Sequence, residues 1–216
     1  MILQVIFLIC AFVAAACIVT AVKEKVHNIG YIVMTVLVAV CDFICFRLLG
    51  CKSVTDARSM MTVYYMVHAW LFFAFAWMVM AISRRKNYML FCIPTALICV
   101  LQTVIMNGNM GRNRIMSLSR HIWFGGAWWV AEDSKGRSGT SALMSFRAYR
   151  ILLYVNILIT LIIMFICCSH SAKVFRSRFY SLIVIHLLFT ALELITARFA
   201  LPIWIICLAI NAICFV

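Results

Sequence analysis

Long apolar runs separated by short polar segments dominate the pattern of this chain. Crossing a hydrocarbon core takes roughly 20 apolar residues of helix, whereas a lipid-facing β-barrel shows alternating segments of about 10 residues. The runs in this chain are long and unbroken, so they favour helices. The pattern predicts spans at about residues 2–22, 29–49, 61–82, 88–106 and 151–168.

The last apolar tract, residues 179–216, is too long for one ordinary span. Arg198 and Pro202 divide it, because a charged side chain and a residue without an amide donor both interrupt a membrane helix. Two spans in this tract give seven spans in total. The alternative count is six spans, with the final tract partly re-entrant.

Three regions follow from this pattern: a four-span membrane region in residues 1–106, a polar loop in 107–150, and a membrane region of two or three spans in 151–216. In the connection before the third span, Ser53 or Asp56 is expected to cap the next helix. The expected fold is an all-α integral membrane protein with about seven transmembrane helices and one interfacial loop.

Composition agrees with this membrane assignment. Hydrophobic residues make up 67% of the chain and the mean hydropathy is +1.10, which is far too apolar for a water-soluble core. The net charge is +13, but the nineteen basic residues lie mainly at the ends of the apolar runs. That placement favours the lipid bilayer, with anionic headgroups, as the partner and argues against nucleic acid. It is also compatible with a membrane-protein partner or a second copy of the chain.

The basic residues do not settle the orientation of the chain in the membrane. Lys23 and Lys25 place the connection after the first span in the cytoplasm, whereas seven basic residues in the 107–150 loop place the opposite face there. Both orientations stay open, as does the identity of the membrane.

Eleven cysteines, an odd number, lie mostly inside apolar runs or at their edges. This distribution does not predict a disulfide framework. Cys41 and Cys45 share a helix face but lack further ligands, so no metal site is predicted. Cys51, Cys167 and Cys168 lie where a span meets water, which makes them candidates for palmitoylation. The alternative is that they are small buried thiols.

Strongly polar side chains inside the spans are costly in hydrocarbon unless they are paired, so each one indicates packing or function. Counting about 1.5 Å per residue from the predicted helix ends places four of them in one layer on the loop side of the membrane. These four are Asp42, His68, Asn156 and Glu193, with Asp42 and His68 expected to meet. His186 and Asn211 are secondary candidates, with His186 on the same helix face as Glu193.

Two interpretations of this polar layer remain. In one, it is a hydrated, proton-responsive cluster in which His68 changes charge beside Asp42. In the other, it holds the helices together, each hydrogen bond contributing about 0.6 to 2 kcal/mol. We favour the second interpretation.

The segment from Arg120 to Asp133, RHIWFGGAWWVAED, contains two aromatic, strand-forming runs around Gly125 and Gly126. It predicts a short β-hairpin, since a Gly-Gly pair supplies positive backbone dihedrals for a turn. A short interfacial helix is the alternative. Six side chains are expected to contact lipid headgroups or a partner: Trp123, Trp128, Trp129, Arg112, Arg114 and Arg120.

No catalytic motif stands out in the sequence. It contains no nucleotide-binding glycine loop, no HExxH and no GxSxG, and only six acidic residues. The predicted hairpin would bring His121 toward Glu132 or Asp133, but no nucleophile is evident beside them. We therefore expect a non-enzymatic protein without a cofactor.

Crowded spans and one small basic, aromatic loop make the chain similar in composition to some small membrane proteins of RNA-virus envelopes or replication compartments. This resemblance implies a protein that organises a membrane or a membrane assembly, which is our leading hypothesis. The alternative is a small channel or transporter for ions or protons that uses the layer of Asp42, His68, Asn156 and Glu193. In either case the loop is expected to cover the face toward which that layer lies.

Overall fold

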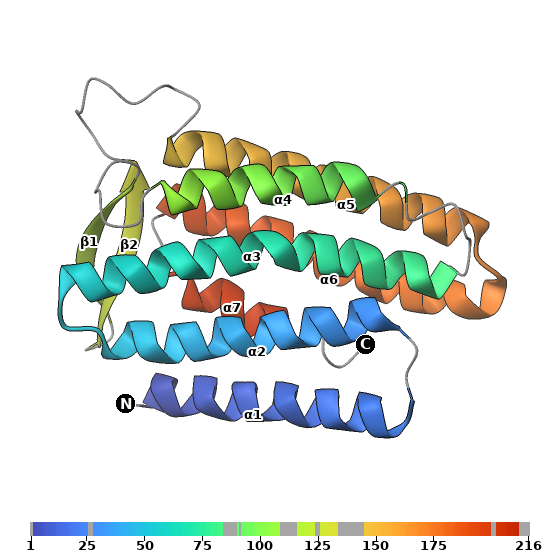
Figure 1. Cartoon of the computed structure of the whole chain (residues 1–216), viewed down its shortest axis with the longest axis horizontal. Coiled ribbons are helices and arrows are strands. Elements are labelled where there is room, and N and C mark those ends of the chain that lie inside the picture. Colours follow the sequence, from blue (N-terminus) through green and yellow to red (C-terminus); the bar gives the residue numbers. More distant parts are fainter. Residues whose placement is uncertain are drawn as a thin grey trace.

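The computed structural model describes residues 2–25, 28–83, 90, 92–108, 116–123, 126–133, 145–199 and 202–211. These residues form seven helices and one two-stranded sheet (Figure 1). The helices are α1 (Ile2–Lys23), α2 (Ile29–Gly50), α3 (Val54–Ser83), α4 (Cys92–Asn107), α5 (Phe146–His170), α6 (Lys173–Phe199) and α7 (Trp204–Ile210). The strands are β1 (Met116–Trp123) and β2 (Gly126–Asp133).

Five of the helices are long and apolar enough to cross a membrane: α1, α2, α3, α5 and α6. Helix α4 is apolar but has 16 residues, and at about 1.5 Å per residue it is slightly shorter than a hydrocarbon core of about 30 Å. Helix α7 has only 7 residues, too few to cross. The protein is therefore a multi-pass helical membrane protein, as predicted. Residues 212–216 of the final apolar tract lie outside the described residues.

The last apolar tract is interrupted where the sequence predicted. Helix α6 ends at Phe199, one residue after Arg198, and α7 begins at Trp204, two residues after Pro202. Figure 1 shows α7 starting at the end of the bundle where the hairpin lies and running back alongside α2. It contacts both α2 and α6, so this short helix is held inside the bundle.

Helix α3 begins earlier than the hydropathy pattern predicted, at Val54 rather than near residue 61. The Ser53 hydroxyl accepts a hydrogen bond from the Asp56 amide at 3.1 Å and donates one to the Asp56 carboxylate at 2.8 Å. Ser53 therefore caps α3, as predicted, by satisfying one of the amides that a helix leaves free at its start. Polar side chains such as Thr55, Arg58 and Ser59 occupy the first two turns, so the hydropathy pattern did not include that part of the helix in the predicted span.

Helices α2 and α3 approach each other closely where α2 begins. A Cβ built on Gly30 would lie 2.5 Å from the backbone nitrogen of Met78, so only glycine permits this approach. The Asn28 side chain donates a hydrogen bond to the Met78 carbonyl at 3.2 Å in the same place. These contacts fasten α2 to α3 at the end of the bundle opposite the hairpin (Figure 1).

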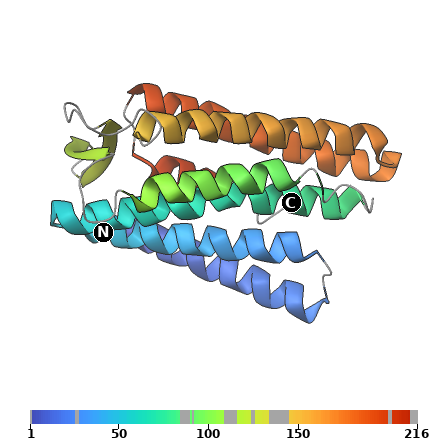
Figure 2. The same cartoon turned by 45° about the horizontal axis from the view of Figure 1, so that its top comes forward.

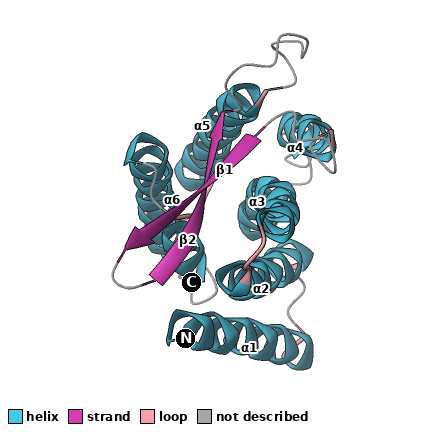
Figure 3. Cartoon of the chain, turned by 90° about the vertical axis from the view of Figure 1, so that its left-hand side faces the viewer, coloured by secondary structure: helices cyan, strands magenta, loops and turns pink. Residues whose placement is uncertain are grey.

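Helix α3 is the centre of the bundle, packing against α2, α4 and α5, while α1 lies at the edge and packs mainly on α2 (Figures 2 and 3). The outward faces are apolar: Phe12 is 68% exposed, Leu97 60% and Val184 64%. Large exposed hydrophobic side chains on several helices are expected when lipid is the surrounding solvent.

The predicted hairpin is confirmed. Strands β1 and β2 pair antiparallel from Met116 opposite Asp133 to Trp123 opposite Gly126. Gly126 therefore belongs to the strand, and the connecting residues 124 and 125, including Gly125 of the expected turn, lie outside the described residues. Figure 3 shows the two strands lying across the end of the helical bundle.

Candidate functional site

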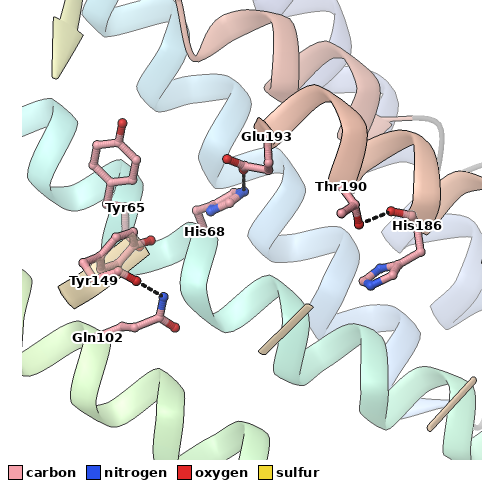
Figure 4. Close-up of polar contacts among 7 residues, drawn as sticks. All are labelled: Tyr65, His68, Gln102, Tyr149, His186, Thr190 and Glu193. Carbon is pink, nitrogen blue, oxygen red and sulfur yellow. Dashed lines mark hydrogen bonds and ion pairs between the residues drawn. The ribbon is translucent and has the colours of Figure 1, made fainter. Parts of the chain in front are cut away.

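A buried contact between a histidine and a carboxylate joins His68 of α3 to Glu193 of α6. The His68 Nε2 atom lies 3.0 Å from the Glu193 Oε1 atom, and the two side chains are 2% and 11% exposed. Figure 4 shows the two side chains pointing toward each other from their helices. The imidazole also stacks on the Tyr64 ring, with the ring centroids 5.5 Å apart. This contact therefore connects the central helix to the last long span.

Asp42 does not meet His68, so that expected pairing is wrong. Asp42 is fully buried, and its Oδ1 atom accepts hydrogen bonds from the Asn211 amide at 2.8 Å and from the Cys207 thiol at 3.4 Å. The Asn211 amide also donates to the Cys207 carbonyl at 3.0 Å. Asp42 thus binds the end of α7 to α2, and Asn211 is its principal partner.

Asn156 makes a third, separate contact. Its amide donates to the Cys99 sulfur of α4 at 3.4 Å, and the Cys99 thiol donates to the Ala69 carbonyl of α3 at 3.1 Å. The two bonds form a short chain from α5 through α4 to α3. Cys99 was not among the sequence-predicted site residues, since a cysteine in an apolar run carries no signal of its own.

Gln102 and Tyr149 add polar contacts that the sequence analysis missed. The Gln102 amide donates to the Tyr149 carbonyl at 3.4 Å, and the Tyr149 hydroxyl donates to the Tyr65 carbonyl at 2.8 Å (Figure 4). Gln102 is fully buried within α4. An amide side chain inside the apolar run of α4 was the available signal for this contact.

His186 packs in the same α3–α6 interface as Glu193, as its spacing on the helix predicted. Its Nε2 atom lies 3.1 Å from the Ile157 carbonyl, and its ring stacks on Phe75 with the centroids 5.6 Å apart. A cavity of about 20 Å³ lies beside it, lined by His68, Leu71, Phe72, Phe75, His186, Phe189 and Ile210. That volume is enough for about one water molecule.

The predicted polar layer is therefore divided among three helix pairs rather than gathered in one cluster. Several buried polar atoms in it have no hydrogen-bond partner within the described part of the chain: Asp42 Oδ2, Tyr64 OH, His68 Nδ1, Gln102 Oε1 and Asn156 Oδ1. Such atoms are uncommon in protein interiors, and each has the capacity to form a hydrogen bond with water. The polar side chains of this layer thus form contacts between helices, while some of their atoms make no hydrogen bond to a described residue.

The hairpin is docked on the bundle. Trp129 is 5% exposed, and its indole nitrogen donates to the carbonyl of Cys51, just after α2, at 3.4 Å. A cavity of about 10 Å³ separates the tryptophans from the α6–α7 connection, lined by Cys45, Leu48, Leu49, Trp128, Trp129, Pro202, Ile203 and Trp204. The expectation that Trp129 contacts lipid is therefore wrong, because tertiary packing covers its ring.

The remaining loop predictions divide by position. Arg120 is exposed, and its guanidinium lies 5.8 Å from the centroid of the Trp129 ring across the strand pair. Trp128 is half-buried. Arg112 and Arg114 lie outside the described residues, as does the side chain of Trp123. Of the predicted contact residues whose side chains the structure describes, Arg120 is exposed, whereas Trp128 is half-buried and Trp129 is buried.

The cysteine candidates for palmitoylation differ in access. Cys167 and Cys168 are 1% and 6% exposed, so that prediction is wrong for them and the buried-thiol alternative holds. Cys51 is half-buried beyond the end of α2, and its thiol donates to the Arg47 carbonyl at 3.3 Å. Burial and then Asp56 raise the pKa of the Cys51 thiol, against an opposing effect of Arg47. A raised thiol pKa lowers the reactivity of Cys51 at neutral pH.

The hairpin register separates the ionisable residues that it was expected to bring together. His121 lies opposite Trp128, whereas Glu132 lies opposite Ser117, four positions along β1. At about 3.3 Å per residue, His121 and Glu132 are not cross-strand neighbours.

Comparisons of the chain with protein-family models, with curated proteins and with solved structures found no match.

Proposed function

We propose that this protein is a non-enzymatic, multi-pass membrane protein that organises a membrane or a membrane assembly through the face on which its hairpin is docked. The observation that carries this proposal is the seating of the hairpin: Trp129 is buried against α2, while Arg120 on the opposite strand is exposed. Docking keeps the guanidinium in one place, where it suits lipid phosphate or an acidic partner. The compositional resemblance to viral envelope and replication-membrane proteins supports the same interpretation.

Under this proposal the polar layer holds the bundle together. The His68–Glu193 and Asp42–Asn211 contacts each join helices that are distant in the sequence. In lipid, such bonds supply association energy that the hydrophobic effect does not, because lipid tails are as apolar as the helices themselves. A stable bundle is what a fixed hairpin face requires.

Photo-crosslinking tests the role of the hairpin face. A photoreactive amino acid at Arg120 is expected to give lipid or protein adducts in native membranes, identified by mass spectrometry. The control is the same residue at Lys173, an exposed basic position at the start of α6 on the opposite end of the bundle. Adducts at Arg120 that are absent, or no more abundant than those at Lys173, would overturn the proposal.

A second candidate function, a small channel or transporter for ions or protons, is favoured by one specific observation. Helix α7 is a short helix that follows the interruption at Pro202, and Asn211 at its end binds Asp42. Asp42 is a fully buried carboxylate whose second oxygen has no hydrogen-bond partner among the described residues. Interrupted helices that end inside a bundle build the ion sites of many secondary transporters.

Flux measurements separate the two candidates. The purified protein in liposomes, the Asp42→Asn variant and the His68→Ala variant are compared for proton and cation flux. Our leading proposal expects background flux in all three. Flux above background in the unmodified protein that falls in both variants would overturn a purely structural role for the polar layer, provided that gel filtration shows both variants to be folded.

A further inference from the structure

An open cleft lies between α1, the end of α2 and the start of α3. Its volume is about 440 Å³, within the usual range for a site that binds a small organic group. Nine residues line it: Gln4, Phe46, Arg47, Gly50, Cys51, Lys52, Asp56, Ser59 and Met60. Among the described cavities it is the one whose walls carry two basic side chains.

The charges in the cleft favour an anion. Arg47 and Lys52 are exposed, and neither has an ion-pair partner among the described residues. Asp56, the one acidic residue of the lining, is held by the Ser53 hydroxyl at 2.8 Å as part of the α3 cap. The start of α3 contributes partial positive charge next to it, which offsets the carboxylate. With two basic residues and one acidic residue, the lining of the cleft therefore carries a net positive charge.

The remaining walls match an amphiphile. Phe46 and Met60 are half-buried and apolar, and Phe43, one turn before Arg47 on α2, is 53% exposed. The Gln4 amide lies against Gly50, where a Cβ would be 3.0 Å from its Nε2 atom, so a further hydrogen-bond donor stands at the wall. The two basic side chains lie in the last turn of α2 and just after it, and the apolar side chains lie beside them on α2 and α3.

We propose that this cleft binds the phosphate of an anionic phospholipid, with Arg47 and Lys52 as its charge partners and the acyl chains lying along α1 and α2. An arginine guanidinium offers two parallel donors to a phosphate, and a lysine adds a point charge. The cleft is separate from the exposed Arg120 surface on which the proposed function rests. The two proposals therefore fail independently.

The test measures lipid retention by the full-length protein in detergent micelles, using native mass spectrometry. The probes are dioleoyl phosphatidylglycerol and dioleoyl phosphatidylcholine, which share acyl chains, and glycerol phosphate, which has none. Preferential retention of phosphatidylglycerol is expected. Removing both charges in R47Q/K52Q is expected to lower it roughly thirtyfold, at the usual contribution of basic residues near an anionic surface.

Two further variants make the result decisive. K173Q/R178Q removes the same charge from exposed positions on α6 at the other end of the bundle and is expected to leave retention unchanged. Gly50→Leu fills the cleft without changing its charge and is expected to lower retention. Equal retention of the two lipids, equal loss in K173Q/R178Q, full retention in Gly50→Leu, or binding of glycerol phosphate as tight as that of the lipid would each overturn the proposal.

Discussion

Two of the buried polar contacts of the bundle, His68 with Glu193 and Asp42 with Asn211, differ in the helices that carry them. The first joins α3 and α6, which both qualify as membrane spans, whereas the second joins the span α2 to a helix of 7 residues. A contact between two spans fixes the bundle itself. A contact with a short helix fixes only how that helix returns into the bundle, so the two pairs should differ in how much stability depends on them.

The largest effect is expected from Glu193→Ala. This change leaves the His68 imidazole buried without its carboxylate, and breaking a buried pair by removing one partner costs about 3 kcal/mol. Unfolding in mixed detergent micelles measures the loss. Glu193→Gln, which keeps an acceptor oxygen, should lose much less.

A neighbouring lipid-facing position provides the control for this prediction. Leu194 is 51% exposed, so Leu194→Ala removes a side chain from the same helix without touching the pair. If Glu193→Ala lowered the stability of the protein no more than Leu194→Ala, the pair would not contribute the stability that we expect of it.

A smaller effect is expected from Asn211→Ala. It removes the 2.8 Å hydrogen bond to Asp42, worth about 1 kcal/mol for an ordinary buried bond. A double-mutant cycle with Asp42→Asn separates this pair from general effects on the bundle. A coupling energy near zero would contradict the expected contribution of this bond, and one larger than that of His68 and Glu193 would reverse the comparison.

The smallest effect is expected from salt. Buried pairs are screened far less than exposed ones, so the coupling between His68 and Glu193 should be almost the same at low and high ionic strength. Repeating the His68/Glu193 cycle at both salt concentrations measures this directly. A marked decrease at high salt would mean that the pair is open to water.

The lengths of the apolar runs predicted where the long helices lie, but they predicted the first residue correctly for only some of these helices. The expected spans at residues 2–22 and 29–49 match α1 and α2 to within one residue. Helices α3, α5 and α6 begin several residues before the predicted spans, because hydropathy reports only the part of a helix inside hydrocarbon. The first turns of these helices each contain a basic residue, which lowers their hydropathy and hid the true start of the helix.

The polar candidates could be predicted, but most of their partners could not. Depth along each span follows from residue counting, and it correctly selected Asp42, His68, Asn156 and Glu193 as buried. Which span lies beside which, and how each is rotated, leaves little trace in helices that are apolar on nearly every side. For that reason the sequence paired Asp42 with His68, and Cys99 and Gln102 were overlooked.

The docked hairpin also has a consequence for biogenesis. Synthesis proceeds from the N-terminus, so the Cys51 carbonyl is available to the Trp129 indole as soon as the hairpin has emerged. Pro202 and Trp204, on the other side of the tryptophan cavity, are made only after α5 and α6. The hairpin would therefore acquire its packing in two stages, the second of them after α6 has been translated.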